Sequence, residues 1–244
     1  MRRALRVAWA VISALLVESV LLALGAVPSL LFLAWLWRST VGTVRAAVLL
    51  CAFGPAYVGF AIMFMVLSAL AMSALRWRTP DNAALRIARM EWPLLDWARY
   101  LASTHVVRIV AGSVFRATPL WTWYLRLNGA RIGRGVYVNS LAVMDHNLLQ
   151  FGDGVVIGAG AHLSGHTVEG GIVKTGGVQL GRDATIGVGS VVGIDVVVGT
   201  GTQVGALSLV PKHSRLSDRA VYAGVPVQRI DGHRADRRLA FIPT

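Results

Sequence analysis

The chain has 244 residues, of which 55% are hydrophobic, and its formal net charge is +12. A mean hydropathy of +0.59 is too high for an ordinary soluble domain, so membrane spans are expected. The single cysteine, Cys51, excludes an intrachain disulfide framework and a cysteine-based zinc site. The positive charge favours anionic lipid headgroups over nucleic acid as a partner, because arginines cluster just after the apolar runs.

Two long apolar runs occupy the first third of the chain. Residues 7–37 contain one charged residue, Glu18, and residues 46–75 contain none. Each run exceeds the ~20 residues that a helix needs to cross a bilayer, so residues 1–79 are predicted to form a transmembrane hairpin with spans at about 8–36 and 46–75. A charged residue inside a span is a functional candidate. Glu18 has either such a role or none, as a protonated or oligomer-facing residue.

The distribution of arginine orients this hairpin. Three arginines precede the first run and four follow the second closely, whereas only two lie between the runs. The positive-inside rule then places both termini in the cytoplasm. We therefore expect a multi-pass protein of the cell (inner or plasma) membrane with a cytoplasmic soluble domain, membrane lipids as partners and no nucleic-acid partner.

Residues 80–131 mix apolar, aromatic and arginine residues. Residues 79–82 (Thr-Pro-Asp-Asn) indicate a turn and a helix start, and residues 83–101 carry arginines at helical spacing. Trp121, Trp123 and Tyr124 follow among further arginines. The pattern is typical of amphipathic helices in the membrane interface. The alternative is a packed helical linker that cradles the next domain, and both can hold.

Residues 132–210 fall into six-residue units, each led by an apolar residue that is often followed by glycine. The leading residues are Ile132, Val138, Met144, Phe151, Ile157, Leu163, Leu180, Ile186, Val192, Val198, Val204 and Val210. The register breaks twice, at the extra residue Gln150 and at about eleven residues, 169–179. Three units form one triangular coil, and coils must stack to bury their core. An all-β parallel β-helix of about four coils is predicted over 132–215, followed by a closing segment and basic tail, 216–244.

The long insertion marks the candidate site, because insertions in a solenoid gather on one face and often carry function. His166 stands just before it, and histidine is the side chain best suited to removing a proton near neutral pH. Asn139 and Asp145 lie one coil earlier and are expected on the same side, where an oxygen would orient the imidazole. His146 and His162 are either corner residues or members of the site, and three histidines also raise a zinc alternative.

Three features resemble the hexapeptide-repeat acyltransferases over about residues 130–232. They are the repeat, the block from Val138 through the Ser164-Gly165-His166 segment, and residues 222–230. The likeness is to galactoside, maltose and nodulation O-acetyltransferases. It implies a left-handed coil, His166 as general base with Asn139 and Asp145 in support, acetyl-CoA or another acyl-CoA as donor, and no metal. The spans followed by residues 118–133 also look like the C-terminal membrane modules of poly-lysine-synthetase-like peptide synthetases.

The same resemblance implies where substrates bind. The pantetheine arm would follow coils 180–210, where glycines allow close approach, and Lys212 would meet the coenzyme phosphates. The glycines are Gly187, Gly193, Gly199 and Gly205. His146, Glu169 and Lys174 are candidates for acceptor binding, the last two because the family's Asp and Arg after the histidine are absent. The soluble relatives place their site between subunits of a trimer, so a homotrimer is one possibility, and the sequence leaves the oligomeric state open.

The sequence therefore predicts a membrane-anchored acyltransferase. It would move an acetyl or other short acyl group from acyl-CoA to a hydroxyl or amine of a membrane-associated acceptor, such as a lipid-linked sugar, a glycolipid or an amphiphilic peptide. The alternatives are a synthetase-like module that forms peptide bonds and a non-catalytic scaffold. The sequence distinguishes neither the acceptor nor the acyl length, nor an acyl-CoA donor from a carrier-protein thioester.

Overall fold

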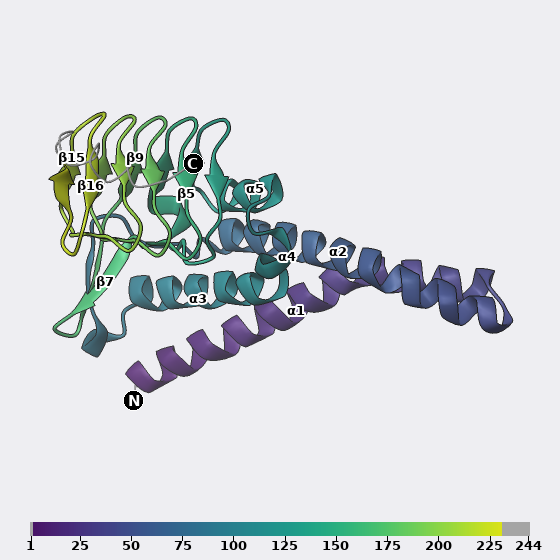
Figure 1. The fold of residues 1–244 in the computed structure, drawn as a ribbon. Helices are drawn as coiled ribbons and strands as arrows, with labels where there is room; N and C mark the ends of the chain where they lie inside the picture. The colour runs from purple at the N-terminus through teal and green to yellow at the C-terminus, as the bar shows by residue number, and fades with distance from the viewer. Residues whose placement is uncertain (1, 231–244) are drawn as a thin grey trace, which may run out of the picture. The chain divides into compact units, whose positions relative to one another are not determined.

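A computed structural model describes residues 2–230, and these divide into two compact units (Figure 1). The helical unit holds the chain up to Trp77 together with Leu95–Val114. The β-helix unit holds Arg78–Leu94 and the chain from Phe115 onward. The expected basic tail lies, from residue 231, outside the described residues.

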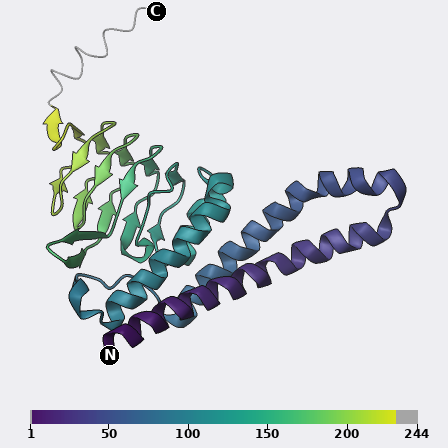
Figure 2. The same ribbon diagram turned by 90° about the horizontal axis from the view of Figure 1, so that it is seen from below.

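Two long helices dominate the helical unit and run alongside each other as a hairpin (Figure 2). They are α1 (Arg2–Ser39) and α2 (Gly42–Leu75), and both are long and apolar enough to cross a membrane. Large apolar side chains such as Leu16, Leu31 and Leu50 are exposed, as a lipid-facing surface requires. The two predicted helices are confirmed, whereas their insertion in a bilayer stays a prediction. Glu18 is buried within this unit.

Shorter elements complete the helical unit. They are α3 (Trp92–Val107), which belongs to this unit from Leu95, the π-turn η2 (Arg108–Gly112) and the start of α4 (Ser113–Phe115). Tyr100 of α3 packs into a buried cluster with Met72 and Trp77. The Arg99 guanidinium lies 5.1 Å from the centre of the Trp77 ring and completes this packing.

The segment before α3 differs from the expected helix over residues 83–101. It forms the strand β1 (Ala84–Arg86) and the short 3₁₀ turn η1 (Ile87–Arg89), and the helix begins only at Trp92. The reason is tertiary: β1 pairs antiparallel with β8 (Ile172–Thr175), so its backbone groups are satisfied in a sheet.

Helix α5 (Pro119–Leu127) covers the first coil of the β-helix. Its first residue is proline, whose missing N–H costs nothing at a helix start. Trp121, Tyr124 and Leu125 are fully buried, and the Trp121 Nε1–H donates to the Ser140 carbonyl at 3.2 Å. The last part of the connector, α5, therefore packs against the β-helix, whereas the interfacial position of connector helices stays a prediction.

Three parallel sheets form the walls of the β-helix (Figure 1). Sheet I comprises β2 (Arg131–Ile132), β4 (Leu149–Phe151), β9 (Val178–Leu180), β12 (Val196–Val198) and β15 (Arg215–Leu216). Sheet II comprises β3 (Tyr137–Val138), β5 (Val156–Ile157), β10 (Thr185–Ile186), β13 (Gln203–Val204) and β16 (Val221–Ala223), with β17 (Gln228–Ile230) added antiparallel. Sheet III comprises β6 (His162–Leu163), β11 (Val191–Val192) and β14 (Leu209–Val210). Four coils are complete, and β15 and β16 begin a fifth, in agreement with the expected four coils. The left-handed sense of the coil stays a prediction.

The predicted leading residues face the core with one exception. Val143, not Met144, pairs with Leu163 of the next coil and is fully buried. The third unit therefore begins one residue earlier than predicted, and the turn between Val143 and β4 contains the 3₁₀ turn η3 (His146–Leu148).

The corners of the coils place residues in the left-handed region of the backbone. Glycine fills many of these positions, and Asp145, Asp195 and His213 fill others with φ of 56°, 51° and 64°. Aspartate tolerates this region better than most residues because its short polar side chain bonds locally. The corner between sheets III and I, called the site edge below, carries all three.

The long insertion is an ordered hairpin rather than a loop. Strand β7 (His166–Glu169) and β8 pair antiparallel across a turn at Gly170 and Gly171, and β1 adds a third strand. The hairpin projects from the coils where β7 is labelled in Figure 1. The hairpin is inserted between β6 of sheet III and β9 of sheet I, so its base lies at the site edge.

Candidate active site

His166 and Asp145 form a close pair at the base of the hairpin. His166 Nδ1 lies 2.6 Å from Asp145 Oδ2. The Asp145 side chain is completely buried, whereas that of His166 retains 15% exposure. A carboxylate can only accept, so Nδ1 carries the proton and Nε2 holds the lone pair of the neutral ring. An imidazole held in this way by a carboxylate, with one nitrogen free to accept a proton, has the geometry that general-base chemistry requires.

The backbone brings these two residues together from different coils. Asp145 precedes η3 in the left-handed conformation, and His166 is the first residue of β7. Gly165 lets the strands approach, because a Cβ there would lie 2.9 Å from both Asp145 Cβ and Leu148 Cδ1. Only a residue without a side chain fits this position without displacing Asp145.

Asp145 accepts hydrogen bonds on both carboxylate oxygens. Oδ2 also receives the Gly165 N–H at 3.0 Å and the Ser164 hydroxyl at 3.2 Å, and Oδ1 receives the Thr79 hydroxyl at 2.7 Å. Donors on both oxygens stabilise the ionised form of a buried carboxylate. Ser164 lies two residues before His166, and this proximity in the sequence is a signal that could have indicated its place in the site. Thr79 is 66 residues from Asp145 and carries no local signal.

Asn139 lies away from this pair. It follows β3, at the corner between sheets II and III, and its N–H donates to the Ile157 carbonyl at 2.9 Å. Asp145 lies at the next corner of the same coil, because Val143, which pairs with Leu163 of sheet III, separates the two. This placement contradicts the expected support of the catalytic histidine by Asn139.

His146 points inward although it adjoins Asp145. His146 is 1% exposed, and its Nε2 lies 3.0 Å from the Val143 carbonyl oxygen. The Tyr124 ring packs edge-on against it, with 5.8 Å between the two ring centres. The expected contact with a substrate is therefore wrong, because the ring is part of the packing under α5. His162 lies in β6 and is half-buried.

Glu169, Lys174 and Lys212 meet on the exposed side of the hairpin. Lys212 Nζ lies 2.6 Å from Glu169 Oε1, and Lys174 Nζ lies 3.0 Å from Oε2. The hydrogen bond from Lys212, followed by that from Lys174, lowers the pKa of Glu169 from 4.5 to about 2. Because Lys212 follows β14, this cluster ties the hairpin to the fourth coil on the site edge, the edge that carries His166.

The four glycines expected along one coenzyme track lie at three different corners. Gly187 and Gly205 follow strands of sheet II, Gly193 follows sheet III, and Gly199 follows sheet I. They serve coil stacking instead: a Cβ on Gly187 would lie 2.5 Å from the Ala206 nitrogen of the next coil. Only Gly193 shares the site edge, so the single track is wrong.

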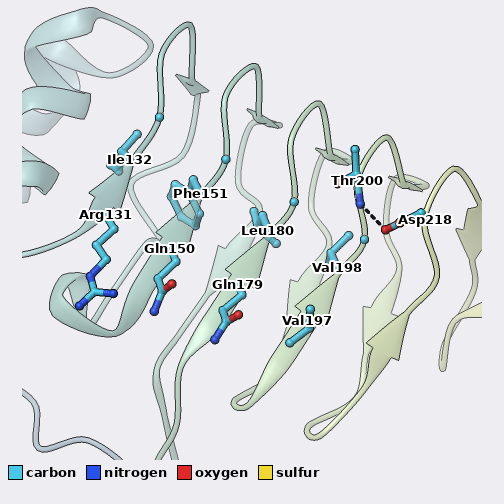
Figure 3. A pocket seen from close by; sticks show the side chains of 14 residues that line it. Arg131, Ile132, Gln150, Phe151, Gln179, Leu180, Val197, Val198, Thr200 and Asp218 are labelled. Carbon is cyan, nitrogen blue, oxygen red and sulfur yellow. Dashed lines mark hydrogen bonds between the residues drawn. The ribbon is translucent and has the colours of Figure 1, made fainter.

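A groove of about 660 Å³ runs across the outer face of sheet I (Figure 3). Arg131, Gln150 and Gln179 point outward from successive strands, and the Thr200 N–H donates to Asp218 at 2.7 Å at its rim. Gly199 lines this groove, whereas Asp145 and His166 do not. Within residues 2–230, no three His, Cys, Asp or Glu side chains gather as metal ligands.

Comparison with known proteins gives distant likenesses. No family model matches the chain. A stretch of 151 residues is 26% identical to the delta-poly-L-ornithine synthetase of Acinetobacter baumannii and covers 61% of this chain but 11% of that protein. The chain therefore spans a small part of this curated relative.

Solved structures of acetyltransferases are also similar. A hexapeptide-repeat-containing acetyltransferase from Vibrio cholerae is 19% identical, with 43% of this chain and 62% of that chain covered and a TM-score of 0.39. A serine acetyltransferase from Brucella abortus is 18% identical, with 73% and 60% covered and a TM-score of 0.40. A galactoside acetyltransferase in complex with coenzyme A is 21% identical, with 46% and 69% covered and a TM-score of 0.38.

Proposed function

We propose that this chain is an acyltransferase in which His166 is the general base. The observation that carries the proposal is the Asp145–His166 pair, held at 2.6 Å where the regular coils open into a hairpin. Burying a carboxylate lowers the stability of the fold, and a corner with only a structural role does not require it. A buried carboxylate that holds one imidazole nitrogen while the ring stays partly exposed is suited to proton transfer.

The chemistry follows from the tautomer of His166. Nε2 takes the proton from the hydroxyl or amine of the acceptor as its oxygen or nitrogen attacks the thioester carbonyl carbon. The tetrahedral adduct then collapses, the carbon–sulfur bond breaks, and the imidazolium returns the proton to the leaving sulfur. Asp145 stabilises the imidazolium between these two steps.

The donor we propose is acetyl-CoA or another acyl-CoA. Lys212 lies two coils beyond His166 on the site edge, and coils stack at the strand spacing, so the separation along the axis is about 10 Å. Lys174 and Lys212 would bind coenzyme phosphates by exchanging their carboxylate partner, Glu169, for the more highly charged anion. No metal takes part in the proposed reaction.

The acceptor we propose lies at a membrane. The two apolar helices, their exposed leucines and the net charge of +12 support anchoring in the cell membrane among anionic lipids, with both termini cytoplasmic where acyl-CoA is made. A lipid-linked sugar, a glycolipid or an amphiphilic peptide would meet the site there. A homotrimer remains part of the proposal.

A second candidate is a module that forms amide bonds between amino acids. The relative named delta-poly-L-ornithine synthetase favours it, since that name implies an amine attacking an activated acyl group. The two candidates share the base and differ in the acceptor. A non-catalytic scaffold would have no use for an oriented histidine.

The test uses the full chain in lipid nanodiscs with acetyl-CoA and a membrane lipid extract. Wild type and His166→Ala are compared by release of free CoA, and His213→Ala is the matched control because His213 contacts Asp195 at 2.8 Å in a similar pair. We expect His166→Ala to lower the rate on the order of 10²–10⁴-fold and His213→Ala to leave it within about threefold. Equal CoA release by wild type and His166→Ala would sink the proposal.

The acceptor is then identified from cells. Lipids and glycans of cells with and without the chain are compared by mass spectrometry, and the purified chain is offered lysine- and ornithine-containing peptides. An acylated lipid or glycan supports the first candidate, and a new amide bond on a peptide supports the second.

A further inference from the structure

The segment that follows the helical unit reaches into the site. Thr79 is 1% exposed, and its hydroxyl donates to Asp145 Oδ1 at 2.7 Å. We infer that Thr79 is a positioning residue, which fixes the Asp145 carboxylate in the orientation that holds His166. The inference rests on the proposed role of His166 as general base.

Thr79 acts at the carboxylate oxygen that His166 does not use. His166, Ser164 and Gly165 all donate to Oδ2, so their bonds leave the carboxylate able to pivot about that oxygen. The terminal torsion of aspartate is broad, and a second fixed point is needed to define its plane. The bond from Thr79 to Oδ1 supplies that point.

Thr79 is itself held on both sides of its backbone. The Asn147 side chain accepts from the Thr79 N–H at 3.2 Å and donates to the Thr79 carbonyl at 2.8 Å. Asn147 lies two residues after Asp145, so the same turn supplies the carboxylate and the clamp for the residue that orients it. A chance contact would not need this reciprocal pair of bonds.

The residues after Thr79 are tied to the other partner of the pair. The Thr175 hydroxyl donates to the Pro80 carbonyl at 2.6 Å and accepts from the Ala83 N–H at 2.9 Å. Thr175 stands opposite His166 in the register of β7 and β8. One short segment therefore fixes the turn that carries Asp145 and the hairpin that carries His166.

The test compares four full-length proteins in nanodiscs: wild type, Thr79→Val, Thr79→Ser and Thr202→Val. Valine keeps the shape of threonine and removes its hydroxyl, whereas serine keeps the hydroxyl. Thr202 is the matched control, because it is fully buried in the same unit and its hydroxyl donates to the Ser217 carbonyl at 2.6 Å, outside the site. Thr79→Ala replaces the valine variant if that protein lacks a cooperative thermal transition.

Two readouts are taken from each protein. The first is the rate constant for CoA release. The second is the rate at which diethyl pyrocarbonate modifies His166, followed by peptide mass spectrometry and divided by the rate at His213 in the same molecule. The second readout reports the availability of the Nε2 lone pair and needs no substrate of the chain.

We expect Thr79→Val to lower both readouts, CoA release by about tenfold, the loss expected for one hydrogen bond to a charged group. Thr79→Ser and Thr202→Val stay within about threefold of wild type. An unchanged His166 labelling ratio in Thr79→Val overturns the inference, and so does a serine variant as impaired as the valine variant. If wild type releases no CoA but Thr79→Val still slows labelling, the positioning role stands and the proposed function fails.

Discussion

Replacing Asp145 by asparagine separates the charge of the carboxylate from its shape. The amide oxygen takes the place of Oδ2 and can still accept from His166, Ser164 and Gly165, whose donor atoms lie 2.6, 3.2 and 3.0 Å from Oδ2 in the wild type. The amide NH₂ takes the place of Oδ1 and faces the Thr79 hydroxyl, which accepts instead of donating. The number of hydrogen bonds is kept, so we expect a loss of about 1–3 kcal/mol in the free energy of unfolding.

The loss of activity is expected to be far larger than the loss of stability. A neutral amide does not stabilise the imidazolium that forms when His166 takes up the proton of the acceptor. Rates of CoA release therefore fall on the order of 10²–10⁴-fold. Wild type, Asp145→Asn and Asp195→Asn are compared at equal folded fraction, with thermal unfolding monitored in parallel.

Asp195 provides the control because it contacts His213 at 2.8 Å on the same edge but is 42% exposed. Asp195→Asn should leave the rate within about threefold. The reasoning is refuted if Asp145→Asn keeps more than half of the wild-type rate while His166→Ala abolishes it, since His166 would then work without its carboxylate.

Two further predictions concern the same edge. Gly165→Ala places a Cβ 2.9 Å from Asp145 Cβ and should cost about 1–3 kcal/mol in the free energy of unfolding and lower CoA release; a thermal midpoint equal to wild type contradicts the close packing. Glu169→Gln removes the negative charge and leaves one amide oxygen in place of the two oxygens that accept from Lys174 and Lys212. Because the folded pKa of Glu169 is lowered to about 2 from 4.5, its stabilisation is present above pH 4.5 and lost as the pH falls towards 2. The difference in thermal midpoint between wild type and Glu169→Gln should be constant from pH 8 to 5 and shrink below about 4.5; a difference that grows on acidification excludes this sign.

The sequence predicts the large elements because their signals are local. The apolar runs define α1 and α2, and the six-residue period defines the coils. The period places the third unit one residue too late, because Val143 and Met144 are both apolar and either could lead it. Only the pairing with Leu163 in the folded structure shows that Val143 leads the unit. Strand β1 was missed because its partner lies about 90 residues later in the chain.

The site divides in the same way. The insertion led to His166, and spacing by one coil led to Asp145. Asn139 and His146 satisfy the same sequence criteria. Asn139 nevertheless lies one corner earlier, directly after β3, and the turn at η3 buries the His146 ring. Thr79 belongs to a turn signal in the sequence, but nothing local indicates its contact with Asp145, which lies 66 residues later.

The repeating corners have a consequence for how such sites arise. Asp195 and His213 stand one coil apart on the site edge, as do Asp145 and His166, and their ring nitrogen and carboxylate oxygen lie 2.8 Å and 2.6 Å apart. The exposed pair has side chains 62% and 42% accessible, and the other pair 15% and 0%. The bare solenoid thus produces the acid–base couple as a by-product of its periodicity, and the added hairpin and connector turn one copy into a shielded site. Transplanting that cover by two whole coils, onto Asp195 and His213, would move the site along the axis by about 10 Å.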